Sequence, residues 1–164
     1  MSIAQAMLGE FEHESRITRK FLERVPQDKL KWKPHEKSHT AGALAMHIAI
    51  VPGNVVRAAM VDESPLPDFA SLFKQPASVQ EILDAHEKSV ETVREILPTF
   101  DDAGLMTNWS AMLDGKPVMT MPKVIFLRSI MLNHWIHHRG QFGVYLRLVG
   151  AKVPASYGPS GDEQ

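Results

Sequence analysis

The 164-residue chain contains no cysteine. This absence excludes disulfide scaffolds, thiolate zinc sites, iron–sulfur clusters and a cysteine nucleophile. The chain also lacks an excess of either charge, because 18 Lys and Arg stand against 19 Asp and Glu, for a formal net charge of -1. Proteins that bind nucleic acids by neutralising phosphates usually carry a basic excess, so we expect no nucleic-acid partner. Eight histidines remain as candidate metal ligands or acid–base groups.

No apolar run is long enough to cross a bilayer. The longest weakly polar run extends from Ala41 to Gly53 and is interrupted by His47 and Pro52, whereas a membrane-spanning helix needs about 20 apolar residues. The first 14 residues hold three glutamates and no Lys or Arg, unlike a signal peptide. We therefore expect a cytoplasmic protein with no membrane partner. Its length and its 44% hydrophobic content predict a single globular domain over residues 1–164.

Helical periodicity marks four segments, and no strand pattern is convincing. The segments cover about residues 3–25, 40–61, 79–97 and 122–149. Their start and stop signals are Ser2 with Gln5, Ser38 or Thr40, Ser78 with Glu81, Thr120 with Pro122, and Gly150. Pro52 lies inside the second segment, where it removes a backbone donor and predicts a kink.

These four segments predict an all-α fold, a four-helix bundle. We expect a short link between the first two helices, a longer connection between the third and fourth, and a non-helical tail after Gly150. Within that longer connection, residues 107–119 contain Asp114-Gly115, a turn signal. A small hairpin and an irregular loop are both open there.

The segment most informative about chemistry is NHWIHHRGQ, from Asn133 to Gln141. His134 and His138 are four residues apart, so they project from one face of the predicted helix, and that face is its apolar one. His47 lies on the apolar stripe of the second helix and could add a third nitrogen. Three imidazoles around one divalent ion leave a position open for water or substrate, which is typical of a catalytic site.

Other interpretations of the histidines stay open at this point. His137 could pair with His134 in place of His138, His86 is a further candidate on the third helix, and any of them could be an ordinary core or surface residue. Two helical metal motifs fit less well. Trp135 occupies the position of the general-base glutamate in His-Glu-x-x-His zinc proteases. The Glu-x-x-His pairs that a di-iron bundle needs fall partly in a loop.

Four further residues could contact the ligands or the substrate. Gln141 and Tyr145 share the helix face of the histidine pair, and Asn54 lies one heptad after His47, so these side chains could orient the imidazoles. Arg139 could bind an acidic substrate or a thiol carboxylate, or it could simply face solvent. No carboxylate lies on that face, so the catalytic residues stay unknown.

Two stretches resemble the DinB family, the damage-inducible, DinB/YfiT-like group regarded as metalloenzymes. They are WKPHEKSHTAGALAMH at 32–47, and NHWIHHRGQFGVYLRLVG at 133–150 followed by VPASYGPSGDE at 153–163. The resemblance implies a four-helix bundle, commonly a homodimer, in which His47, His134 and His138 hold a divalent metal ion, typically zinc or nickel.

The same resemblance implies a small-molecule substrate. Some members of the family are transferases or isomerases that use low-molecular-weight thiols such as bacillithiol or mycothiol. A thiol-dependent S-transferase that acts on small electrophiles is therefore the first expectation. A metal-dependent hydrolase and a non-catalytic, metal-binding stress-response module are the alternatives.

Overall fold

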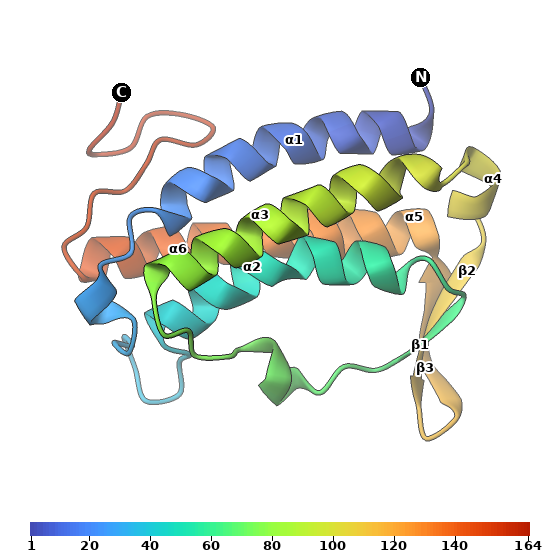
Figure 1. Cartoon of the computed structure of the whole chain (residues 1–164), viewed down its shortest axis with the longest axis horizontal. Helices are drawn as coiled ribbons and strands as arrows, with labels where there is room; N and C mark the ends of the chain where they lie inside the picture. Colours follow the sequence, from blue (N-terminus) through green and yellow to red (C-terminus); the bar gives the residue numbers. More distant parts are fainter.

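The computed structural model describes all 164 residues. Three long helices lie side by side with a fourth, composite rod (Figure 1). The helices are α1 (Ile3–Leu22), α2 (Ala41–Ala58) and α3 (Val79–Ile96), and the rod joins α5 (Lys123–Phe126), η4 (Leu127–His134) and α6 (Trp135–Leu148). The connections hold α4 (Asp102–Leu105) and the short turns η1 (Gln27–Lys29), η2 (Phe69–Leu72) and η3 (Leu97–Thr99). One cluster of buried apolar residues draws on all four long elements.

The prediction of an all-α fold is wrong, because a three-stranded mixed sheet stands at one end of the bundle (Figure 1). β2 (Asn108–Leu113) pairs antiparallel with β3 (Lys116–Pro122) and parallel with β1 (Glu63–Pro65). The hairpin is one of the two alternatives open for residues 107–119. Asp114 and Gly115 have φ angles of 50° and 73°, as the two-residue turn of a hairpin requires. β1 is three residues long and pairs with a distant segment, so no local pattern could show it.

Most of the expected helix boundaries are present. The side chains of Ser2, Thr40 and Ser78 accept hydrogen bonds from backbone N–H groups of α1, α2 and α3, and Gly150, at φ 78°, follows α6. Two expectations at the connections are wrong. Thr120 lies in β3 and caps no helix. The link between α1 and α2 is not short, since it covers residues 23–40 and includes η1.

The composite rod is not α-helical throughout. Leu127–His134 form a π-helix, in which hydrogen bonds join residues five apart and each turn holds more than 3.6 residues. The face presented by the rod therefore shifts along this segment. Such segments are frequent at functional sites, and this one ends at His134.

A hydrogen bond between side chain and backbone compensates for Pro52 inside α2. Proline has no N–H, so the carbonyl of Ile48, four residues earlier, has no helical donor. The indole Nε1 of Trp135 donates to this carbonyl at 2.8 Å, and Trp135 and Ile48 are buried. Because Ile48 follows His47 and Trp135 follows His134, the bond holds the two histidine-bearing elements in register.

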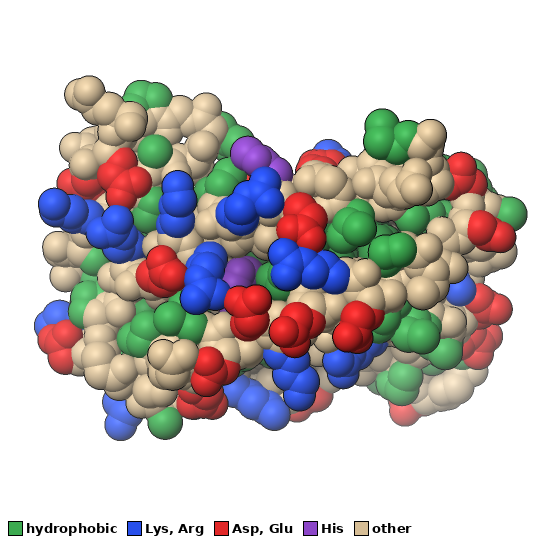
Figure 2. Space-filling model, turned by 45° about the horizontal axis from the view of Figure 1, so that its top comes forward, with side chains coloured by type: hydrophobic (Ala, Val, Ile, Leu, Met, Phe, Trp, Pro, Cys, Tyr) green, Lys and Arg blue, Asp and Glu red, His purple; other side chains and the backbone are tan.

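α2 is the one helix whose length and apolarity would suit a membrane span, yet 72% of its length is buried inside the protein. It is therefore a core helix of the protein, packed against α3 and the composite rod. On the face seen in Figure 2, acidic and basic side chains are interspersed and form no patch of one sign.

Candidate metal centre

The histidines that the sequence singles out lie together. His47 comes from α2, His134 from the end of η4, and His138 from the first turn of α6, and one ring nitrogen of each lies within 4.8 Å of the other two. The Nε2 atoms of His47 and His134 are 3.2 Å apart. The three ring planes are nearly perpendicular to one another, at 85°, 87° and 88°.

Two hydrogen bonds determine which nitrogens face the centre of this cluster. Nδ1 of His47 donates to the carbonyl of Leu72 at 3.1 Å, and Nδ1 of His138 donates to Oε1 of Gln141 at 2.9 Å. A neutral imidazole that donates from Nδ1 carries a lone pair on Nε2. Both Nε2 atoms are therefore prepared to bind a cation, in the way that outer partners commonly orient ligating histidines.

Burial keeps the three imidazoles neutral. It lowers the pKa of His47 and of His134 to about 4, and it lowers the pKa of His138 as well. The neighbouring histidines act in the same direction on each of the three, whereas the bonds to Leu72 and Gln141 act against it. Neutral imidazole is the form that binds metal ions.

The donor set fits a divalent transition-metal ion. Imidazole nitrogens suit zinc, nickel and their neighbours, whereas calcium and magnesium prefer oxygen ligands. Two nitrogens bound to a tetrahedral zinc ion at ~2.0–2.1 Å lie about 3.3 Å apart. The separation of the His47 and His134 nitrogens is close to that value. Three protein ligands leave a coordination position open.

A cavity of about 530 Å³ reaches His47 and His134. Its volume is in the range of small-molecule sites. Its walls are mostly apolar, and its polar lining residues besides the two histidines are Asn54, Arg57 and Ser64. No acidic side chain lines it, so the cavity offers no carboxylate as a general base.

Sequence reasoning missed the segment that covers the site. The ring of Phe73 stacks on His47, with centroids 4.1 Å apart, and on His39, with centroids 3.6 Å apart. Together with the carbonyl of Leu72, these contacts fix the ring of His47. The only signal was the apolar character of residues 69–73, FASLF, in a connection that has no periodicity.

Three of the further candidates lie near the histidines. Gln141 binds His138, and Asn54 lines the cavity. The hydroxyl of Tyr145 donates to the backbone carbonyl of His39 at 3.3 Å. It therefore supports the residue whose imidazole ring stacks on Phe73.

Arg139 is placed elsewhere. It is 2% exposed, and its Nη1 donates to Oε2 of Glu14 at 2.6 Å. Its Nη2 donates to the hydroxyl of Tyr157 at 2.8 Å, so it joins α6 to α1 and to the C-terminal tail. His137 is exposed and His86 is buried on α3, and both lie outside the three-histidine cluster.

Known relatives match nearly the whole chain. The family model for the DinB family matches residues 1–164. YrdA of Bacillus subtilis (strain 168), an uncharacterized protein, is 27% identical over 158 residues, which are 95% of this chain and 89% of YrdA.

Two solved structures share the fold. A DinB-like protein from Bacillus cereus ATCC 10987 superposes with a TM-score of 0.74 at 26% identity, over 95% of this chain and 98% of that one. The DinB-like protein YjoA from Bacillus subtilis superposes with a TM-score of 0.69 at 20% identity, over 97% and 99% of the two chains. Since the family model extends over every element that builds the histidine cluster, the chain belongs to the DinB family.

Proposed function

We propose that this protein is a metal-dependent enzyme that acts on small molecules, with His47, His134 and His138 as the ligands of a zinc or nickel ion. The observation that carries the proposal is the convergence of three neutral imidazoles beside a cavity of small-molecule size. The bonds from Nδ1 of His47 and of His138 to Leu72 and Gln141 leave the Nε2 lone pairs of both rings free to bind a cation.

The reaction we favour is transfer to or from a low-molecular-weight thiol such as bacillithiol or mycothiol. A bound divalent cation supplies Lewis-acid chemistry, because it lowers the pKa of a thiol or water ligand. The cavity holds no carboxylate that could take a proton from water. A thiol with an ordinary pKa near ~8.5 needs far less assistance than water, with a pKa near ~15.7. This difference supports the transferase over the metal-dependent hydrolase.

The proposed setting is a homodimer in the cytoplasm. Val144 and Leu148 are one turn apart on α6 and are 59% and 58% exposed, so they offer an apolar stripe for a second copy. Light scattering of the purified protein, beside a Val144→Asp/Leu148→Asp variant, tests this state. If the double variant still has the mass of a dimer, the dimer interface does not include this face of α6.

Metal analysis tests the ligand assignment. After exposure to zinc or nickel and removal of free ions, the native chain should retain about one ion, and a His134→Ala/His138→Ala variant should retain almost none. His137→Ala is the matched control, since it removes an exposed histidine of the same helix and should leave the metal content unchanged. A native chain that retains no ion would overturn the proposal.

The reaction is tested by incubating the loaded protein with a small electrophile, with and without bacillithiol or mycothiol. Turnover that requires both the metal and the thiol supports the transferase. Turnover without the thiol would establish the hydrolase instead. A protein that keeps its metal and turns over in neither assay would be a binding module and no enzyme.

A further inference from the structure

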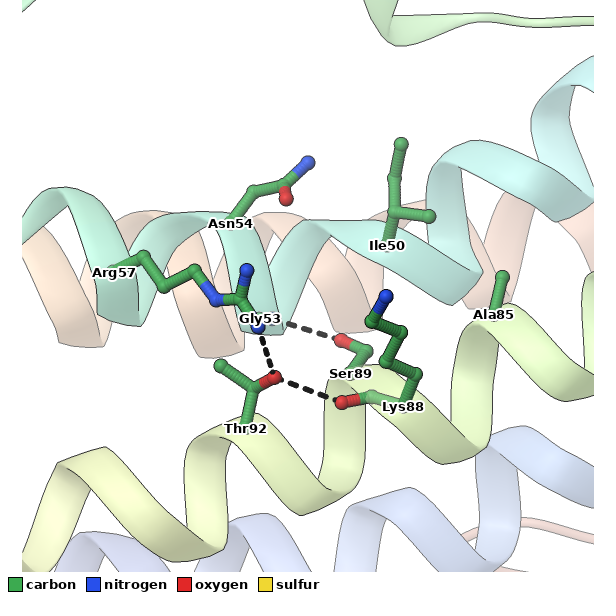
Figure 3. Close-up of a pocket in the computed structure, with 8 residues that line it drawn as sticks. All are labelled: Ile50, Gly53, Asn54, Arg57, Ala85, Lys88, Ser89 and Thr92. Carbon is green, nitrogen blue, oxygen red and sulfur yellow. Dashed lines mark hydrogen bonds between the residues drawn. The ribbon is translucent and has the colours of Figure 1, made fainter.

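Arg57 on α2 differs from every other arginine of the chain, because it has no carboxylate partner. The others each form an ion pair with a glutamate or aspartate. Nη2 of Arg57 donates to Oγ1 of Thr92 at 2.8 Å, and the hydroxyl of Thr92 donates to the carbonyl of Lys88 at 2.9 Å (Figure 3). These bonds hold the guanidinium in place while most of its N–H groups remain free.

Arg57 lies between two cavities. It lines the apolar cavity that reaches His47, and it also lines a smaller one of about 120 Å³ between α2 and α3. Asn54 lines both as well. Lys88 enters the smaller cavity from α3, opposite Arg57 (Figure 3). No acidic residue lines either cavity.

Where the two cavities meet, at Asn54 and Arg57, the free polar groups are mostly hydrogen-bond donors. We call this place the junction. The hydroxyl of Ser89 accepts the N–H of Gly53 at 2.8 Å, and the helices are so close here that a Cβ on Gly53 would lie 3.0 Å from Ser89. Ser89 and Thr92 are thus engaged within the protein. What remains is Asn54 and two cations, Arg57 and Lys88, neither of which can accept a hydrogen bond.

The distance between the junction and the histidines sets the size of a ligand. Arg57 is ten residues beyond His47 on α2, which corresponds to about 15 Å along a helix axis. Between them the cavity is walled by apolar residues, including Val51, Val55 and Ile130. A molecule that spans this distance meets the imidazoles at one end, apolar walls along its length and positive charge at the other end.

We propose that the substrate is an amphipathic anion, with an apolar body in the larger cavity and a carboxylate-like group bound by Arg57 and Lys88. Arginine forms paired, charge-assisted hydrogen bonds with such groups. This assignment rests on the proposed function and names the substrate class of the same site. It makes Arg57 a specificity determinant that lies far from the metal ligands.

Calorimetric titration with octanoate and with octan-1-ol tests the proposal, because the two probes share an apolar chain and differ in charge. Each probe is titrated into zinc-loaded and into chelator-treated protein. Octanoate should bind about tenfold more tightly than the alcohol in both forms. Arg57→Gln should weaken octanoate binding by about tenfold and leave octan-1-ol binding unchanged. Arg16→Gln is the control, since it removes one exposed arginine from α1, away from the cavities.

A second variant, Ala58→Phe, fills the larger cavity without changing a charge and should weaken the binding of both probes. Equal affinities for octanoate and octan-1-ol, or equal effects of Arg57→Gln and Arg16→Gln, would overturn the proposal. The proposal would also be overturned if octanoate bound only to zinc-loaded protein and Arg57→Gln did not weaken its binding. The carboxylate would then bind the metal.

Zinc content measured in the same samples separates this inference from the proposed function. A protein that retains zinc but binds neither probe disproves the substrate class alone. A protein that retains no zinc, yet binds octanoate through Arg57, disproves the proposal of a metal-dependent enzyme and supports the anion-binding site.

Discussion

At the scale of one residue, Gln141 orients the imidazole of His138, one of the proposed metal ligands. Its Oε1 accepts from Nδ1 of His138 at 2.9 Å. Gln141→Leu removes this acceptor and should lower zinc affinity by about tenfold, because the ring loses its orientation. Gln141→Glu keeps an acceptor at the same place and should retain the affinity. Competition with a chromogenic chelator measures both, and an unchanged affinity in Gln141→Leu would show that the bond does not orient the ring.

His86 predicts a pH dependence of stability that is independent of the metal site. The side chain is 2% exposed and its Nδ1 has no hydrogen-bond partner. Burial lowers the pKa of His86 to about 4, an effect that the backbone of Ser15 opposes only in part. The unfolded chain therefore binds a proton near pH 6.5 that the folded chain does not bind until about pH 4. The free energy of unfolding should fall by about 3 kcal/mol across this window as the pH drops.

Comparison with His86→Leu isolates this contribution, because His47 and His134 titrate in the same window in metal-free protein. Urea unfolding at several pH values between 7 and 4 measures the difference between the two chains. The variant should become the more stable of the two as the pH falls. A difference that does not vary with pH would show that His86 is protonated equally in both states.

At the scale of elements, the bond from Trp135 to the Ile48 carbonyl is the contact that joins α2 to the composite rod beside the histidines. Trp135→Phe removes the donor, leaves a buried carbonyl unpaired and reduces the packed volume. We expect a loss of about 2–4 kcal/mol in the free energy of unfolding. Urea titration with a folded baseline by circular dichroism measures this loss.

The Pro52→Ala background provides the control for this loss. Alanine restores a backbone N–H that can donate to Ile48, so Trp135→Phe should be about 1 kcal/mol less costly there than in the native chain. Additive losses in the double variant would show that the indole stabilises the bundle by packing alone.

Elements with local signals could be predicted from the sequence, and elements defined by distant pairing could not. Ser2, Thr40 and Ser78 mark helix starts because capping is a contact between near neighbours. Asp114-Gly115 indicates a turn for the same reason. β1 pairs with β2 across an entire helix, so its three residues have no local signal, and the all-α prediction failed there.

The histidine cluster could be predicted from the sequence, because one face of a helix and one apolar stripe bring its members together. The residues around the cluster could not be predicted. Phe73 and Leu72 belong to an irregular connection whose path depends on tertiary packing. Arg139 is one residue after His138, and its buried partner on α1 could not be inferred from periodicity.

At the scale of the whole molecule, a buried ion pair connects α1, α6 and the C-terminal tail. Glu14 and Arg139 have side chains 6% and 3% exposed, and the hydroxyl of Tyr157 bridges them, accepting from Arg139 and donating to Glu14. Glu14→Gln leaves the buried guanidinium without a counter-charge and should lower the free energy of unfolding by about 3–5 kcal/mol.

Glu10→Gln is the matched control on the same helix. Glu10 also pairs with an arginine, Arg128, but both side chains are substantially exposed, at 37% and 47%, so its loss should cost at most about 1 kcal/mol. The Glu14 variant should also release the tail, because Tyr157 loses the carboxylate to which it donates. Trypsin should then cut faster after Lys152, which lies near the start of the tail, in Glu14→Gln than in Glu10→Gln. Equal cleavage rates in the two variants would show that the tail is held by its other contacts, such as that of Arg147 with Asp162 at 2.6 Å, and that the buried pair stabilises only the helices.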